Sequence, residues 1–381
     1  MNMKIIADNK IPFLKGAFEP YADIEYLSPS EITKDRVSDA DALIIRTRTR
    51  CNAELLSGSK VKFIATATIG YDHIDAVFCE SENINWVSAP GCNSTSVMQY
   101  ITSALLMFAG KKSIDLTRLT IGVVGVGNVG SKVAKAAAIL GMKVLLNDPP
   151  RERKEGKGSY VSLDEIIDYS DIITFHTPLI KEGIDRTFHL ADESFFSKLK
   201  RKIIIINSSR GPVADSVALK KAAGEGKLNG LILDVWEKEP ELDLELLKLA
   251  DIATPHIAGY SSDGKANGTS ICVNAVNRFF NLGMEENWKP SEIPLPFNPV
   301  NIEIDCRNMT DQQILCRAVT GSYDIYEDNS ALKKSPESFE KQRNYYKVRR
   351  EFDTYKVTLL NPETKAADKL TGLGFNVLAL K

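Results

Sequence analysis

The first ninety residues of the chain alternate short apolar runs with longer and more polar segments. The apolar runs are KIIAD, DIEYL, DALIIRT, KFIATAT and INWVSAP. Runs of this length are typical of strands buried in a parallel sheet, and the segments between them are long enough for crossover helices. The pattern therefore predicts a small doubly wound α/β domain over residues 1–92, with a flavodoxin-like parallel sheet.

A second alternation of the same kind follows a long apolar helix. The run STSVMQYITSALLMFAG predicts this helix from Ser94 to about Gly110, capped by Asn93 or Ser94 and apolar enough to be buried. The strands expected after it lie in LTIGVVGV, KVLLN, DIITFHTP, KIIIINSSRG, GLILDVW and DIATPHIAG, with helices near residues 131–140, 163–169, 192–199 and 215–224. A second long helix, over about residues 263–282, is expected to return the chain to the first domain. The pattern thus predicts a second doubly wound parallel sheet.

The turn after the first strand of this second sheet carries a glycine pattern, GVGNVG. Gly125 permits a sharp turn, Gly127 lets a pyrophosphate approach the backbone, and Gly130 lets the following helix lie close to the sheet. Unpaired N–H groups at the start of that helix, where Asn128 and Val129 lie, offer a pyrophosphate hydrogen bonds and the positive end of the helix dipole. The pattern predicts a Rossmann-type NAD-binding domain over residues 93–256.

Asp148 ends the next strand, eighteen residues past Gly130. A carboxylate at this spacing accepts hydrogen bonds from the adenosine ribose hydroxyls and repels a 2′-phosphate, so NAD is favoured over NADP. Arg151 lies close by and leaves NADP open as an alternative, because an arginine is what accommodates the extra phosphate in such sites.

Three polar residues follow strands of this sheet and suit the oxidation of a hydroxy acid. Arg210 follows IIIINSS, Glu239 follows LDVWEK and His256 follows DIATP. The planar guanidinium of Arg210 matches a substrate carboxylate, His256 can take the hydroxyl proton, and Glu239 can hold the imidazole. Because the carboxyl ends of parallel strands meet at one edge, we expect the three to lie together.

The chain contains 381 residues, which is more than one core usually supports, so two or three domains are expected. A formal net charge of −2 without a long basic run indicates neither nucleic acid nor a membrane surface as partner. No run is long enough to span a bilayer, and MNMKIIADNK is a strand pattern rather than a signal peptide. The six cysteines lack metal-binding spacing, so we expect no metal, reduced thiols and a cytoplasmic protein.

Residues 290–299 (PSEIPLPFNP) hold four prolines and read as a linker. Beyond them, NIEID, YKVTLLN and GFNVLAL indicate strands, with a helix near residues 311–318 and a charged segment over residues 340–351. The pattern predicts a small α+β domain over residues 288–381. About eighty residues bury little surface alone, so we expect this domain to dock or to form a homodimer.

The motifs GVGNVG, FHTPL, NSSRG, LDVWEKEP and TPHIAGYS together resemble the D-isomer-specific 2-hydroxyacid dehydrogenases, over residues 1 to about 285. The resemblance implies that Arg210 binds the substrate, that Glu239 is the partner of the histidine, and that His256 is the acid/base. It implies that residues 1–92 and 257–287 form the substrate (catalytic-lid) domain. It also implies that the NAD contacts include Asp148, Thr177, Asp234 and Gly259.

Within the family, ATATIGYDHID, APGCNS, HIAGYS and SFEKQRNYYKVRREF are most similar to members that oxidise 4-phospho-D-erythronate on the route to pyridoxal phosphate. That similarity implies a small phosphorylated 2-hydroxy acid as substrate and a homodimer formed by the C-terminal domain. It implies substrate contacts at Thr47, Thr68 and Tyr260. The chain departs from many relatives at Gln99, where they have Glu.

The phosphate of such a substrate needs a cationic site. Alternate residues of an extended segment point the same way, so Arg46 and Arg48, on either side of Thr47, are predicted to converge on one anion.

Two alternatives stay open at this point. A 3-phosphoglycerate dehydrogenase shares the Arg-Thr-Arg type of turn and often has a C-terminal regulatory domain. An NAD-sensing corepressor on the same scaffold is the alternative outside the enzymes, and the intact Arg210, Glu239 and His256 set argues against it.

Overall fold

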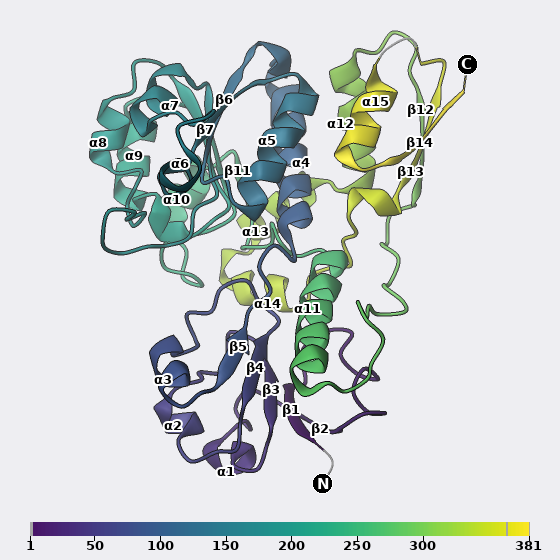
Figure 1. Ribbon diagram of the computed structural model, residues 1–381. Helices are drawn as coiled ribbons and strands as arrows, with labels where there is room; N and C mark the ends of the chain where they lie inside the picture. The colour runs from purple at the N-terminus through teal and green to yellow at the C-terminus, as the bar shows by residue number, and fades with distance from the viewer. Residues whose placement is uncertain (1–2, 363–364, 381) are drawn as a thin grey trace. The chain divides into compact units, whose positions relative to one another are not determined.

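The computed structural model describes residues 3–362 and 365–380 (Figure 1). The chain divides into two compact units, each made of two segments. The first unit is Met1–Asn93 with Ser261–Pro294, and the second is Ser94–Tyr260 with Leu295–Lys381. The structure therefore groups the predicted third domain with the NAD-binding residues, and the second boundary of the first unit lies at Ser261.

The first unit is built on a parallel sheet whose strands follow the order β2-β1-β3-β4-β5, the flavodoxin-like order. Alternate residues of the central strands point to opposite faces: Ile5 packs toward α11, whereas Ile6 packs toward α1, α2 and α3. The elements are β1 (Lys4–Asp8), β2 (Asp23–Leu27), β3 (Ala42–Ile45), β4 (Phe63–Thr66), β5 (Asn85–Val87), α1 (Lys34–Val37), α2 (Ala53–Leu56), α3 (Ala76–Ser81) and α11 (Ser262–Phe280).

The second unit contains a parallel sheet in the order β11-β10-β9-β8-β6-β7. An isolated parallel bridge between Leu146 and Tyr160 extends it past β7, at the place of the third strand of a Rossmann sheet. Its strands are β6 (Thr120–Val124), β7 (Lys143–Asn147), β8 (Ile172–Phe175), β9 (Ile203–Asn207), β10 (Leu228–Leu233) and β11 (Ile252–Ala253). Its helices are α4 (Ser94–Lys112), α5 (Asn128–Leu140), α6 (Pro149–Glu155), α7 (Leu163–Tyr169), α8 (Glu193–Ser197), α9 (Ser216–Gly224) and α10 (Leu244–Leu249). The two doubly wound sheets predicted from the apolar pattern are thus confirmed.

The C-terminal part of the second unit forms a third, smaller sheet in the order β12-β13-β14, again with parallel pairings. Helices α13, α14 and α15 were not predicted. The first lies in an ordinary amphipathic stretch, the second occupies part of the charged segment, and the third lies between the patterns YKVTLLN and GFNVLAL. The elements are β12 (Asn301–Asp305), α12 (Asp311–Ser322), α13 (Ile325–Lys334), α14 (Phe339–Asn344), β13 (Lys356–Leu360), α15 (Ala366–Leu373) and β14 (Asn376–Leu380).

One apolar core joins the C-terminal part to the NAD-binding sheet. Figure 1 shows α4 and α5 against the β6–β11 sheet, with α12 and α15 packed on their other side and the small sheet beyond. Buried members of this core include Ile121, Leu106, Val319 and Val357. Because α4 is buried around most of its circumference, its outer side requires this cover, and the C-terminal residues supply it.

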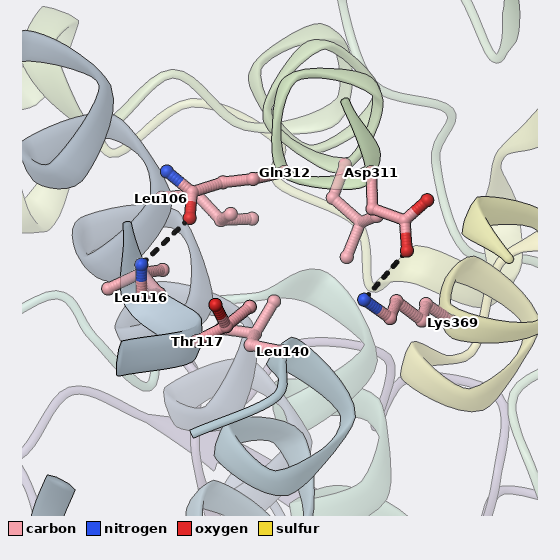
Figure 2. A pocket seen from close by; sticks show the side chains of 8 residues that line it. Leu106, Leu116, Thr117, Leu140, Asp311, Gln312 and Lys369 are labelled. Carbon is pink, nitrogen blue, oxygen red and sulfur yellow. Dashed lines mark hydrogen bonds and ion pairs between the residues drawn. The ribbon is translucent and has the colours of Figure 1, made fainter. Parts of the chain in front are cut away.

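The seam between these helices leaves a cavity of about 20 Å³, roughly the size of one water molecule (Figure 2). Lys369 pairs with Asp311 at 2.8 Å beside it, and the Gln312 side chain accepts from the Leu116 N–H at 2.9 Å. The seam is therefore a packed interface rather than a ligand site. In the described part of the chain, no helix is both long and apolar enough to cross a membrane.

Candidate active site

The glycine turn after β6 has the geometry that a dinucleotide needs. Gly125 has φ +86, and a Cβ there would lie 2.8 Å from the backbone of His176. A Cβ on Gly130 would lie 1.9 Å from the Gly125 carbonyl oxygen, so only glycine lets α5 begin here. A Cβ on Gly127 would meet nothing within 4 Å, and this residue caps α5 without a side-chain hydrogen bond. Gly127 and Asn128 are exposed, so this end of α5 is open to solvent, as pyrophosphate binding at Asn128 and Val129 would require.

Asp148 caps α6 at the end of β7. Its carboxylate accepts from the N–H of Val126 at 2.8 Å and from the N–H of Arg151 at 3.0 Å. The Arg151 guanidinium pairs with Glu155 through two hydrogen bonds of 2.8 and 3.0 Å. Arg151, the residue that kept NADP as an alternative, therefore already has a carboxylate partner. This favours binding of the ribose hydroxyls of NAD beside Asp148 over binding of a 2′-phosphate.

Two buried hydroxyls, that of Thr177 beside this turn and that of Ser208 after β9, have no hydrogen-bond partner among the residues that the structure describes. A bound dinucleotide can supply the missing partners, so these residues fit the cofactor. Thr177 was expected as an NAD contact. Ser208 was not, although it directly follows β9 in NSSRG, and this position is the signal that could have identified it.

His176 lies between the glycine turn and Thr177. Its Nε2 is 2.9 Å from the Thr174 hydroxyl, and burial lowers the pKa of His176 to about 3. The ring is therefore neutral at physiological pH, and so low a pKa makes it a weak base, poorly matched to proton transfer near pH 7.

Arg210, Glu239 and His256 follow β9, β10 and β11, which are neighbours in the sheet, so their predicted places after strands are confirmed. Asp234 comes directly after β10. Asn207, the last residue of β9, donates to the Arg210 carbonyl at 3.0 Å and so shapes the turn that carries the arginine. A Cβ on the next residue, Gly211, would lie 2.0 Å from the Trp236 carbonyl oxygen. The glycine thus lets the Arg210 turn lie directly against the loop after β10.

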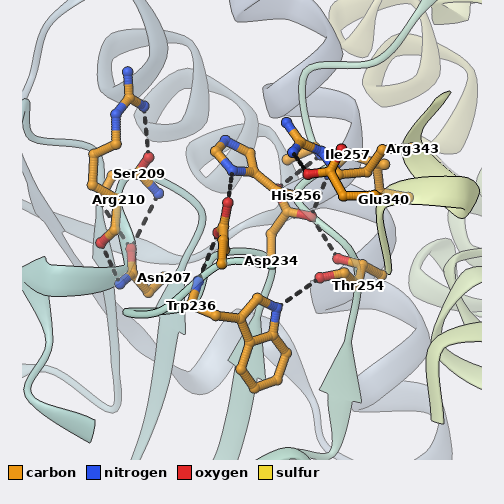
Figure 3. A network of polar contacts seen from close by, with 12 residues as sticks. Asn207, Ser209, Arg210, Asp234, Trp236, Thr254, His256, Ile257, Glu340 and Arg343 are labelled. Atoms are coloured by element: carbon orange, nitrogen blue, oxygen red, sulfur yellow. Dashed lines mark hydrogen bonds and ion pairs between the residues drawn. The ribbon is translucent and has the colours of Figure 1, made fainter. Parts of the chain in front are cut away.

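His256 and Glu239 form a direct pair. Nδ1 of the imidazole is 2.7 Å from one carboxylate oxygen of Glu239, and the other oxygen accepts from the Trp236 N–H at 2.8 Å (Figure 3). His256 has φ +55, an uncommon conformation for this residue type, and its N–H donates to the Asp234 carbonyl at 2.7 Å. Because Nδ1 is engaged, Nε2 is the ring atom that can exchange a proton with a substrate.

Asp234 is buried beneath the loop that carries His256. Its carboxylate accepts from the Thr254 hydroxyl at 2.6 Å and from the N–H groups of Ile257 and Ala258 at 2.8 and 2.9 Å. Burial raises the pKa of Asp234 even though these hydrogen bonds oppose the shift. The structure thus gives Asp234 a role in holding the loop, and its predicted contact with NAD, like that of half-buried Gly259, stays a prediction.

Two arginines from the C-terminal part reach the same loop. Arg343 of α14 donates to the Tyr260 hydroxyl at 3.0 Å, and the Arg349 guanidinium donates to the Ala258 carbonyl. From the sequence, this segment was described as charged over residues 340–351 and counted in the family-like run SFEKQRNYYKVRREF. Its aromatic and basic run, NYYKVRRE, was the available signal, but nothing local indicates which loop it meets.

The predicted substrate contacts at Arg46, Thr47, Arg48 and Thr68 lie in the first unit. Arg46 makes two hydrogen bonds, of 2.9 and 3.1 Å, to the fully buried carboxylate of Asp8. Its charge is thus largely compensated by Asp8, and the convergence of Arg46 and Arg48 on one anion stays a prediction. Thr47 and Arg48 are exposed, and the Thr68 hydroxyl donates to the Gly70 carbonyl at 3.0 Å.

His189, Asp215 and Glu237 place one possible ligand atom each within 4.8 Å of one another. His189 Nε2 lies 2.6 Å from Glu237, whose second oxygen accepts from the Ser216 N–H at 3.1 Å, and Asp215 caps α9. These groups satisfy one another, so the cluster is a hydrogen-bonded network joining two loops.

Comparison with known proteins agrees with this geometry. Residues 107–258 match the model of the D-isomer specific 2-hydroxyacid dehydrogenase NAD binding domain, and residues 295–374 match a domain of unknown function, DUF3410. The chain is 50% identical over 356 residues to an erythronate-4-phosphate dehydrogenase of Bacteroides thetaiotaomicron, covering 93% of this chain and 99% of that one. It is 41% identical over 374 residues to the enzyme of the same name from Porphyromonas gingivalis, covering 98% and 100%.

A solved structure of D-lactate dehydrogenase from Aquifex aeolicus, complexed with NAD and lactic acid, is also similar. It aligns with a TM-score of 0.60 and 30% identity, and the match covers 73% of this chain and 95% of that one. The match thus leaves about a quarter of this chain without a counterpart there. On this evidence the chain belongs to the D-isomer specific 2-hydroxyacid dehydrogenase family, among the erythronate-4-phosphate dehydrogenases, and is an NAD-dependent oxidoreductase.

Proposed function

We propose that this chain oxidises 4-phospho-D-erythronate to (R)-3-hydroxy-2-oxo-4-phosphooxybutanoate, a step in pyridoxal 5′-phosphate biosynthesis. The observation that carries the proposal is the His256–Glu239 pair, which follows strands next to the one that Arg210 follows. The relatives that are 41–50% identical to this chain are named for this activity, and the matches cover nearly the full length of each relative.

The three residues divide the chemistry between them. Arg210 holds the substrate carboxylate, because its fork can donate two parallel hydrogen bonds. His256 Nε2 accepts the proton of the C2 hydroxyl, and Glu239 stabilises the imidazolium that forms. NAD, when bound, accepts the hydride from C2. The products are the 2-oxo acid, NADH and a proton held on His256 until solvent takes it.

The phosphate end of the substrate is assigned to Thr47, Thr68, Arg48 and Tyr260, with Arg46 as support. The first unit, residues 1–93 and 261–294, is proposed as the substrate domain. An exposed arginine turn after β3 supports this assignment, because ligands of doubly wound sheets gather at the carboxyl ends of strands.

The decisive experiment adds 4-phospho-D-erythronate, 3-phosphoglycerate or D-lactate to the purified chain with NAD and records NADH absorbance. Turnover of the first acid with the highest kcat/KM is expected, and His256→Asn serves as the inactive control. A preference for 3-phosphoglycerate would replace the proposed substrate. Tight NADH binding without turnover of any of the acids would favour the corepressor.

We also propose a homodimer formed by the C-terminal part, residues 288–381. On one face of the small sheet, Val357 and Leu359 are buried against helices. The opposite face carries Leu378 and Leu380, which are 42% and 45% exposed. Two exposed leucines on an edge strand are costly in a monomer, and pairing across a two-fold axis would cover them.

A cytoplasmic location is proposed as well. All six cysteines of the sequence are free thiols in the structure, and four of them are buried. Free thiols persist where the compartment is reducing, and NAD serves as cosubstrate there.

A further inference from the structure

We propose that Arg349 is a positioning residue that holds the loop bearing His256 in its reactive geometry. The proposal rests on the role proposed above for His256. It assigns a task in the chemistry to the C-terminal part of the chain, in addition to any part in assembly.

The guanidinium of Arg349 lies in a buried aromatic slot. The residue is 2% exposed, and its Cζ atom lies 4.6 Å from the ring centre of Tyr323 and 5.9 Å from that of Tyr346. Both tyrosine hydroxyls donate to the same oxygen of Asp328, at 2.9 and 2.6 Å. The rings are thus fixed by a common acceptor, and the slot keeps the cation charged and oriented.

From this slot Arg349 donates to the carbonyl of Ala258. The N–H of the same residue donates to Asp234 at 2.9 Å. Both polar backbone groups of Ala258 are therefore held, one by a carboxylate below the loop and the other by the guanidinium. Ala258 lies two residues after His256, whose φ of +55 has to be imposed by its surroundings. The two bonds at Ala258 add to the restraint that His256 receives directly, through its own N–H to the Asp234 carbonyl at 2.7 Å.

The segment that carries Arg349 is itself anchored on α4. The Ser96 hydroxyl donates to Glu351 at 2.8 Å, and Gln99 donates from its amide nitrogen to the Arg350 carbonyl at 2.9 Å. An ionised glutamate at position 99 could not make this second bond, since it has no donor. The brace therefore runs from α4 through residues 349–351 to the catalytic loop.

Stability alone gives a weak reason for this arrangement. Nε and Nη1 of Arg349 are buried without a hydrogen-bond partner among the described residues. Burying a cation with unsatisfied donors is costly, and an apolar side chain would fill the slot at lower cost. The hydrogen bond to Ala258 is what an apolar side chain cannot supply.

The first test measures the loop without any substrate. Arg349→Met keeps the side-chain length and removes the donor and the charge, and Arg349→Lys keeps the charge. Arg317→Met, on the exposed side of α12, is the matched control. In hydrogen exchange of the free protein, the peptide covering residues 256–260 should exchange at least about tenfold faster in Arg349→Met, with peptides of β9 and β10 unchanged. Unchanged exchange of the loop would overturn the proposal whatever the substrate is.

The second test asks whether the effect passes through His256. For Arg349→Met we expect kcat, normalised to bound NADH, to fall about 10- to 100-fold with NADH affinity unchanged, because a small misplacement of the base is costly. In the His256→Asn background the same change should have no further effect. An equal loss of kcat in both backgrounds would show a structural role only. In Arg349→Lys we expect kcat to recover in part.

A milder variant covers the case in which Arg349→Met does not fold. Tyr346→Phe removes one hydroxyl from Asp328 and loosens the slot while the arginine stays. It should accelerate exchange of the loop and lower kcat several-fold, again only when His256 is present. A Tyr346→Phe protein with the exchange and turnover of the wild type would count against the brace. Absence of turnover in the wild type would overturn the proposed function instead, because the exchange test does not depend on it.

Discussion

His256 and Glu239 follow different strands, yet Nδ1 of the imidazole lies 2.7 Å from the Glu239 carboxylate, and the second oxygen of that carboxylate is held by the Trp236 N–H at 2.8 Å. The bond from Trp236 therefore orients the carboxylate, and the carboxylate in turn orients the imidazole. A hydrogen-bonded pair of this kind selects the tautomer with the proton on Nδ1, which leaves Nε2 to act as the base.

Removing either partner should lower turnover by different amounts. His256→Asn should reduce kcat about 10²- to 10⁴-fold, the usual contribution of a general base. Glu239→Gln keeps an acceptor and removes the charge, so we expect a loss of about 10- to 150-fold, equal to one charge-assisted hydrogen bond. Steady-state kinetics with NADH titrations as control would check both. A Glu239→Gln enzyme with wild-type kcat would remove Glu239 from this role.

Two glycines of the cofactor turn should respond differently to alanine. In Gly130→Ala the new Cβ would collide with the Gly125 carbonyl oxygen, so we expect a lower melting temperature and loss of NADH binding. In Gly127→Ala the Cβ has room in the free protein, so the melting temperature should stay within a few degrees while NADH affinity falls at least about tenfold. Differential scanning fluorimetry with and without NADH distinguishes the two. Unchanged affinity in Gly127→Ala would place the pyrophosphate elsewhere.

Arg46 and Arg48 should no longer behave alike. Arg46→Ala leaves the buried Asp8 carboxylate without its partner, so we expect the free energy of unfolding to fall by about 1–3 kcal/mol and all substrates to be affected equally. Arg48→Ala should lower kcat/KM about 10- to 150-fold for the phosphorylated acid and hardly at all for a nonphosphorylated analogue. Urea unfolding measures the loss of stability, and kcat/KM of each variant with the phosphorylated acid and with the nonphosphorylated analogue measures the loss of substrate recognition. Equal losses on both substrates in Arg48→Ala would move the phosphate site, with Arg343 beside Tyr260 as the next candidate.

Acid should destabilise the protein through His176. Burial lowers the pKa of His176 to about 3, whereas the unfolded chain protonates this residue near 6.5. The unfolded state therefore binds more protons between these values, and stability present above pH 6.5 is lost on acidification by about 1.4 kcal/mol per pH unit. His176→Gln should show a smaller loss between about pH 6.5 and 5, by about 2 kcal/mol in urea unfolding. Identical losses in both proteins would mean that folding does not lower the pKa of His176.

The exposed leucines of β14 should decide the oligomeric state. Leu378→Lys combined with Leu380→Lys should convert a dimer into a monomer in light scattering, because two charges cannot be buried in an apolar interface. Val217→Lys, at an exposed position of α9, is the control. Truncation is the poorer test, since the C-terminal part shares a core with α4 and its removal exposes that helix. A dimer that survives the double change would place the interface on another surface.

Most of the fold and the placement of the candidate catalytic residues could be predicted from the sequence. Local periodicity determines where strands and helices form, and the carboxyl ends of parallel strands necessarily meet at one edge, so Arg210, Glu239 and His256 could be brought together without coordinates. The glycine turn was equally predictable, since each glycine answers a local steric requirement at Gly125, Gly127 or Gly130.

Tertiary structure alone decided which distant groups satisfy one another. The buried Asp8 carboxylate pairs with the Arg46 guanidinium. The outer side of α4 is covered by residues 295–381, which belong to the same unit rather than to a separate domain. Arg349 meets a carbonyl ninety-one residues away, at Ala258. Such pairings arise because a buried polar group without a hydrogen-bond partner is costly. The partner is whichever group lies close in the folded chain, however far away it is in the sequence. Periodicity carries no information about that choice, which is why the brace on the catalytic loop could be found only in the folded molecule.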